Sequence, residues 1–165
     1  MHSLTSKGSW KNDMIYVECK PDVALVNALG IPKREIIHAG NKSKVCKRLS
    51  KSENSKGLID QDPWSDQPRY VERLETVYNQ HGVEIREDRQ NKNRLIILCP
   101  RLEEWILEAT KEVNLDITEY GLPNSGKKLH GMINTNISKF RTLIGELLRR
   151  NSNMINVLKN ALKGG

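Results

Sequence analysis

Short apolar runs alternate with longer amphipathic segments over the first two thirds of the chain. The apolar runs predict strands over residues 14–18, 35–38, 57–60, 83–87 and 94–98. Apolar positions three and four residues apart predict helices between them, over residues 21–30, 42–51, 69–81 and 100–113. Because strands and helices alternate, we predict an α/β fold whose mostly parallel central sheet is covered by helices on both faces.

The pattern changes after Asn114. Apolar positions at helical spacing recur over 133–148 and again over 154–162, and no strand candidate follows Leu98. We therefore expect an α/β domain over residues 13–113 and a basic helical extension packed on it over residues 114–165.

Positive charge is concentrated in this extension. The formal net charge is +7, and residues 124–165 hold eight Lys and Arg against the single acid Glu146, so the rest of the chain is balanced. Nucleic acid is the commonest partner of such a basic segment, although a solvated helical face explains the charge equally well. Candidate contacts to nucleic acid are Lys20, Lys42, Lys44, Lys127, Lys128, Arg149 and Arg150.

Several classes of protein are disfavoured. No run of about 18 apolar residues is present, so we expect no membrane span. The segment from Met1 to Asp13 has no apolar signal core, which predicts a cytoplasmic protein. The three cysteines show no zinc-binding spacing and suggest no disulfide framework.

Carboxylates close two of the predicted strands. Glu18 ends the first apolar run, and Asp60 and Asp62 end the third. Acids at the carboxyl ends of parallel strands meet at one edge of a sheet, where their oxygens suit Mg²⁺ or Mn²⁺. Asp-Pro sequences also form ordinary turns, and Asp22 is either a further metal ligand or a first-turn acid favoured by the helix dipole.

The order of these motifs resembles the Toprim domain, a Rossmann-like domain found in topoisomerases, bacterial-type primases and OLD-family nucleases. Its first strand typically ends in Val-Glu-Gly-Lys-x-Asp, which residues 17–22 match except that Cys19 replaces the glycine. A later strand ends in Asp-x-Asp, as residues 60–62 do. The resemblance covers roughly residues 13–113.

The resemblance implies a metal-dependent phosphodiesterase. Glu18 would act as general base or acid or as a metal ligand, and Asp60 and Asp62 would hold Mg²⁺ or Mn²⁺. A chain of 165 residues is too short for a topoisomerase or a full primase, which leaves a nuclease acting on DNA or RNA. The alternative is a non-catalytic Toprim-like subunit that binds nucleic acid or belongs to a larger complex, for example one that contains an ATPase. Candidate protein partners in either case are another protein or further copies of this chain.

Three other residues have two interpretations each. Glu103 and Glu104 are candidate ligands of a second metal, or first-turn acids favoured by the helix dipole. Trp64 either stacks on a base or packs as a hydrophobic plug under the loop that follows the acidic pair, and we favour the plug.

Overall fold

The computed structural model describes residues 13–164. The prediction that the first residues contain no signal core concerns residues 1–12 almost entirely, and these lie outside the described residues. Within residues 13–164, six strands form one sheet in the order β2-β1-β3-β6-β5-β4. The strands are β1 (Ile15–Val17), β2 (Ile36–His38), β3 (Lys56–Asp60), β4 (Glu75–Gln80), β5 (Val83–Asp88) and β6 (Asn93–Leu98).

The sheet is mixed. β1 pairs in parallel with β2 and with β3, and β3 pairs in parallel with β6. β5 runs antiparallel to both β6 and β4. The predicted α/β fold with a mostly parallel sheet is therefore confirmed, and the β4–β5 hairpin is its antiparallel part.

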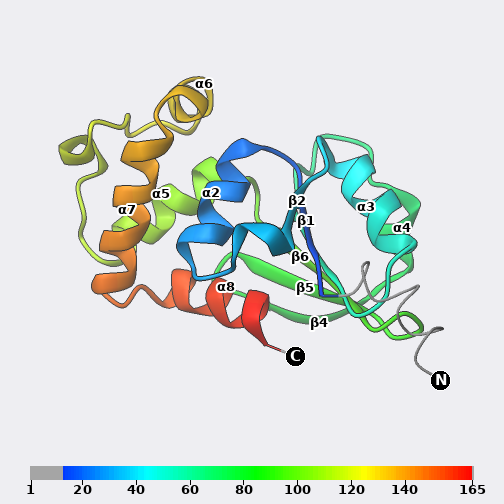
Figure 1. The fold of residues 1–165 in the computed structure, drawn as a ribbon. Helices are drawn as coiled ribbons and strands as arrows, with labels where there is room; N and C mark the ends of the chain where they lie inside the picture. Colours follow the sequence, from blue (N-terminus) through cyan, green and yellow to red (C-terminus); the bar gives the residue numbers. More distant parts are fainter. Residues whose placement is uncertain (1–12, 165) are drawn as a thin grey trace.

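Helices cover both faces of the sheet (Figure 1). In chain order they are α2 (Lys20–Ala28), η1 (Lys33–Glu35), α3 (Lys42–Ser50), α4 (Arg69–Arg73), α5 (Leu102–Glu112), η2 (Ile117–Tyr120), α6 (Gly126–Met132), η3 (Ile133–Thr135), α7 (Ile137–Arg149) and α8 (Asn153–Lys163). α3 and α4 pack on one face, while α2, α5, α7 and α8 pack on the other. Alternate strand residues serve the two faces, as Val17 and Tyr16 do.

The helix predicted over residues 69–81 is wrong. The chain forms the short helix α4 up to Arg73 and then extends into β4. Residues His81 and Gly82 both have positive φ and join β4 to β5 as a two-residue hairpin turn. The local hairpin therefore stands where the sequence pattern predicts a helix between two strands.

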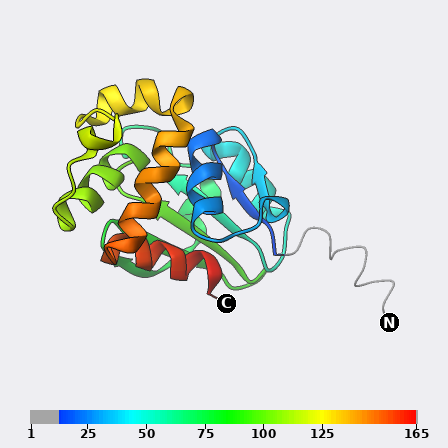
Figure 2. The ribbon, with the colours of Figure 1, turned by 60° about the vertical axis from the view of Figure 1, so that its left-hand side comes forward.

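The helices after residue 113 are built into the main core. Figure 2 shows α7 lying beside α2 across the sheet, with α8 at one end of both. Phe140 and Leu158, from α7 and α8, belong to the same hydrophobic cluster as Leu25 and Trp105 from α2 and α5. Among residues 13–164, none of the helices combines the length and apolar character that crossing a membrane requires.

The topology opens a crevice between β1 and β3. The chain leaves β1 through α2 on one face of the sheet, and it leaves β3 through α4 on the opposite face. Neighbouring parallel strands whose following helices lie on opposite faces leave space at their carboxyl ends, which is the usual ligand position in open α/β sheets.

Candidate metal centre

Glu18 and Asp60 meet at this switch point. Glu18 directly follows β1 and Asp60 closes β3, so the parallel pairing of the two strands brings them to the same edge. A Glu18 carboxylate oxygen accepts a hydrogen bond of 2.7 Å from the backbone N–H of Asp60. Asp60 in turn accepts one of 3.0 Å from the N–H of Leu102, at the start of α5. The first turn of α5 therefore anchors the central carboxylate.

Asp22 is buried beside this pair and is 3% exposed. Its Oδ2 accepts hydrogen bonds of 3.3 Å from both the backbone N–H and the thiol of Cys19, the residue that precedes α2. Asp22 thus lies in the first turn of α2, one of the two roles that the sequence left open for it, and it also interacts electrostatically with Glu18 and Asp60. Burial, followed by the charge of Asp22, raises the pKa of the Cys19 thiol, so this residue is a thiol donor to the carboxylate.

Asp62 lies at the mouth of the site. Its φ of 42° is left-handed, so the chain bends immediately after β3 and the two aspartates do not continue one extended strand. Both nevertheless line a crevice of about 290 Å³, together with Glu18, Asn41, Lys42, Ser43, Ser65 and Asp66. The sequence-predicted trio of Glu18, Asp60 and Asp62 is therefore brought together at one crevice.

The two glutamates at the start of α5 have different environments. Glu103 is 6% exposed, and its charge acts on Glu18, Asp22 and Asp60. Glu104 instead forms an ion pair with Arg101, with hydrogen bonds of 3.0 and 3.1 Å. Of the two second-metal candidates, Glu103 is thus the one whose charge acts on Glu18, Asp22 and Asp60.

Burial and the charges of neighbouring carboxylates raise the pKa values of Asp60, Asp22 and Glu18. For Asp60, burial is the largest cause, followed by the charges of Asp22, Glu18 and Glu103, and together they raise its pKa to about 8. Burial and then Glu18 raise the pKa of Asp22 to about 7. The pKa of Glu18 is also raised, chiefly by burial, against the lowering effect of its hydrogen bond from Asp60 and of Lys42. We call Glu18, Asp22, Asp60 and Glu103 the carboxylate cluster.

Lys42 is the cation that faces this cluster from α3. Its ammonium donates to the carbonyl of Gln61 at 2.8 Å and to the side chain of Gln67 at 3.2 Å. These bonds tie the loop after β3 to the first turn of α3. The plug predicted for Trp64 in that loop is wrong, because its side chain is 78% exposed. The guanidinium of Arg101 lies 5.8 Å from the centre of its ring.

The other basic candidates are distributed over the surface. Lys20 is exposed at the start of α2, and Lys127 and Lys128 are exposed on α6. Lys44 lines a second cavity on α3. Arg149 and Arg150 both form ion pairs with Glu146, and Arg150 also donates to the carbonyls of Val113 and Asn114. The charges of Arg149 and Arg150 are therefore partly neutralised by Glu146.

Sequence reasoning did not identify His130 as a neighbour of the site. Its Nδ1 lies 3.2 Å from a Glu103 carboxylate oxygen, although α6 is far from α5 in the chain. No periodicity or motif links two residues 27 positions apart, so only the packing of α6 against α5 reveals this pair.

The donor set fits a hard divalent cation. Oxygen ligands from carboxylates are those that Mg²⁺ and Mn²⁺ prefer. Burial and then mutual repulsion raise the pKa values of Asp22 and Asp60, and an ion among these groups would offset the repulsion. In residues 13–164 no three Asp, Glu, His or Cys side chains already stand in an arrangement that holds an ion. The fit therefore rests on donor chemistry and on the packing of like charges.

Comparisons with protein families, with curated proteins and with solved structures give no match for this chain.

Proposed function

We propose that this chain is a Toprim-type nuclease that hydrolyses phosphodiester bonds of DNA or RNA and requires Mg²⁺ or Mn²⁺. The observation that carries the proposal is the meeting of Glu18 and Asp60 at the carboxyl ends of two neighbouring parallel strands. Carboxylates are rarely packed this closely in a structural role, so the gathering of Glu18 and Asp60 with the buried Asp22 and Glu103 favours a functional role.

The sheet topology supports the resemblance in the sequence. In a Toprim domain the glutamate ends the first strand and Asp-x-Asp ends a later one, and the two must share a site. Here β3, which ends in Asp60, pairs directly with β1, which precedes Glu18. The substitution of Cys19 for the usual glycine is accommodated because the thiol caps Asp22 from within the turn.

Each group has a specific part in the proposed reaction. Glu18, Asp60 and Asp62 face the crevice and would hold the ion, which when bound polarises the phosphodiester and stabilises charge on the leaving oxygen. Lys42 adds a positive charge at the same crevice and would attract the phosphate. Asp22 and Glu103 are more deeply buried, and a cation that enters the site would favour the charged forms of Asp22 and Asp60, whose pKa values burial and neighbouring carboxylates raise.

A cleavage assay tests the proposal. Plasmid DNA, single-stranded DNA and a structured RNA would each be incubated with the full chain in Mg²⁺, in Mn²⁺ and in EDTA. We expect cleavage only with a divalent ion and its loss in Asp60→Asn, which keeps the size of the side chain and removes its charge. Glu103→Gln should reduce cleavage, while Glu108→Gln, an exposed acid on the same helix, should leave it unchanged.

Two results would contradict the nuclease. Cleavage that persists in Asp60→Asn would come from another site or from a contaminant. No cleavage of any substrate with either ion, combined with nucleic-acid binding that falls as salt rises, would instead assign the chain as a non-catalytic binding subunit.

A further inference from the structure

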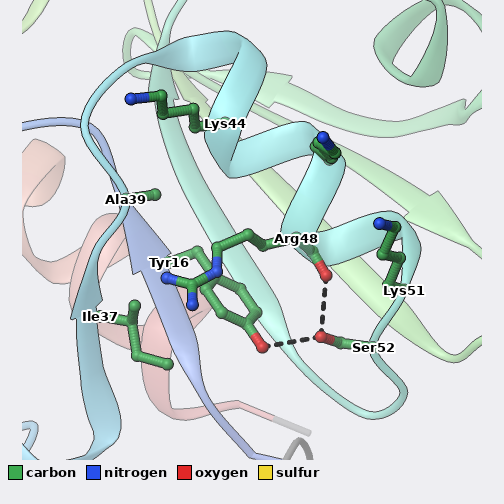
Figure 3. A pocket seen from close by; sticks show the side chains of 8 residues that line it. Tyr16, Ile37, Ala39, Lys44, Arg48, Lys51 and Ser52 are labelled. Atoms are coloured by element: carbon green, nitrogen blue, oxygen red, sulfur yellow. Dashed lines mark hydrogen bonds between the residues drawn. The ribbon is translucent and has the colours of Figure 1, made fainter.

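A second cavity lies between α3 and the strands β1 and β2 at the edge of the sheet (Figure 3). Its volume is about 450 Å³, within the range typical of small-ligand sites. The residues that line it are Tyr16, Ile37, Ala39, Lys44, Lys47, Arg48, Lys51 and Ser52. No carboxylate is among them.

The floor of this cavity is apolar. Ile37 and Ala39 come from the edge strand and its end, and Tyr16 comes from the neighbouring strand β1. The polar atoms at the base bond to one another: the Ser52 hydroxyl donates to the carbonyl of Arg48 at 2.9 Å, which leaves the Tyr16 hydroxyl to donate to Ser52 at 2.7 Å. The floor therefore suits the flat, weakly polar face of a ligand.

The rim carries four positive charges. One side of α3 and of its C-cap carries, at helical spacing, Lys44, Lys47, Arg48 and Lys51. They extend over about 10 Å at a rise of about 1.5 Å per residue. Among the described residues, none of the four forms an ion pair with a carboxylate. Like charges held this close favour an occupant with more than one negative charge.

Arg48 adds a stacking surface to the cavity. Its guanidinium lies 5.8 Å from the centre of the Tyr16 ring and covers that ring, as Figure 3 shows. Bases of single strands stack on arginine planes and aromatic rings, whereas bases in a duplex already stack on one another. An acidic peptide would use the four charges but would leave this flat surface without a partner.

We propose that this cavity, the α3 cavity, binds a single-stranded segment of nucleic acid. One base lies on the apolar floor beside Arg48, and the neighbouring phosphates lie along the lysines. The cavity adjoins the candidate metal centre through α3, because Asn41, Lys42 and Ser43 line the acidic crevice and Lys44 begins the basic rim. The assignment of a single strand as nuclease substrate rests on the proposed function, whereas the binding itself does not.

Binding without cleavage tests this site. Fluorescence anisotropy of a short labelled oligothymidylate would be measured in EDTA over a series of salt concentrations, for the wild-type chain and for Lys47→Ala/Lys51→Ala. The matched control is Lys33→Ala/Arg34→Ala, which removes the same charge from the exposed η1 helix outside the cavity. A third variant, Ala39→Phe, fills the floor without changing any charge.

We expect the Lys47→Ala/Lys51→Ala chain to bind about tenfold more weakly, with a salt slope reduced by about 1.4, because each phosphate contact contributes about 0.7 on a single strand. The η1 control should change affinity less than about twofold, and Ala39→Phe should weaken binding with the salt slope unchanged. Equal losses of affinity in the two double variants would show an effect of net charge alone and would contradict the proposed binding site.

The ligand class is tested by competition. Unlabelled oligothymidylate should displace the probe far better than a polyglutamate of equal charge or the matching DNA duplex. Displacement by polyglutamate as effective as that by the oligonucleotide would assign an acidic peptide instead. Because EDTA prevents metal-dependent cleavage, the binding assay does not depend on nuclease activity. The nuclease proposal can therefore fail while binding at the α3 cavity holds, and binding at the α3 cavity can fail while the nuclease proposal holds.

Discussion

Glu103 and Glu104 are neighbours in the chain, yet Glu103 is buried and Glu104 forms an ion pair with Arg101. Glu18 and Asp60 were predictable because each ends an apolar strand. The choice between Glu103 and Glu104 was not, because both follow the same strand and only packing decides which one is buried. At this scale the sequence predicts which residues approach the site, and packing decides their environment.

Asp22 should destabilise the protein when no cation is bound. Its carboxylate is buried against like charges, so Asp22→Asn should raise the melting temperature in EDTA by about 3–6 °C, which corresponds to about 1–2 kcal/mol for a chain of this size. The amide oxygen can still accept the hydrogen bonds from Cys19. Thermal unfolding followed by circular dichroism measures the effect.

The same measurement in Mg²⁺ is the informative comparison. Wild type should gain stability from the ion by mass action, and Asp22→Asn should gain less because the site is less negative. The control Glu119→Gln, an exposed acid on η2, should behave as wild type in both buffers. An Asp22→Asn chain that melts at a lower temperature in EDTA would contradict this prediction. It would show that the hydrogen bonds from Cys19 to the Asp22 carboxylate stabilise the protein more than the repulsion destabilises it.

Trp64 provides a second prediction at this scale. Its exposure of 78% beside the crevice is unusual for so large an apolar side chain and suits stacking on a base of the proposed nucleic-acid substrate. Trp64→Ala should therefore weaken binding of single-stranded oligonucleotide in EDTA by about tenfold, since one stacked base contributes about 1–3 kcal/mol. Its melting temperature should match that of wild type, and unchanged affinity would contradict the role.

At the scale of elements, the segment 69–81 shows where periodicity alone fails. Tyr70, Leu74, Val77 and Tyr78 fit one side of a helix, yet only α4 forms, and Leu74 already has an extended ψ of 153°. The β-branched Thr76 and Val77 favour a strand, and Gly82 forms a hairpin turn instead of ending a helix. A preference for β structure over six residues outweighs a weak helical pattern.

The hairpin turn depends on Gly82. Its φ is 70°, and a methyl group there would lie 2.6 Å from Cδ1 of Trp105, whose indole nitrogen donates to the carbonyl of His81 at 3.1 Å. Gly82→Ala should therefore destabilise the protein by about 2–4 kcal/mol through backbone strain and overpacking. Urea unfolding measures this, and a midpoint equal to that of wild type would contradict it.

Gly145 is the matched control and has the opposite prediction. It lies inside α7, and a methyl group there would have no atom within 4 Å. Gly145→Ala should stabilise the protein by about 0.5–1 kcal/mol, because alanine loses less conformational entropy in a helix. A lower urea midpoint for this variant would mean that α7 tolerates no side chain at that position in solution.

For the whole molecule, the packing joins the C-terminal helices to the sheet. The Glu112 carboxylate at the end of α5 accepts hydrogen bonds from Ser152 and Asn153 at the start of α8, at 2.7 and 3.1 Å. The amphipathic pattern predicted these helices, but it contained no information on the face of the sheet that they cover. Their position beside α2 depends on contacts far apart in the sequence.

A chain that ends at Val113 should therefore not fold on its own. It would lose the large buried side chains of α7 and α8, which are Phe140, Leu143, Ile144, Leu147, Ile155, Leu158 and Leu162. Each contributes about 1.5–3 kcal/mol by burial, so together they are comparable to the net stability of about 5–15 kcal/mol of a typical domain.

The truncated chain should bind a hydrophobic dye and unfold without a cooperative transition, whereas the full chain should show one. A sharp urea transition in the truncated chain would instead establish residues 13–113 as an autonomous domain, and the carboxylate cluster could then be studied in that fragment alone.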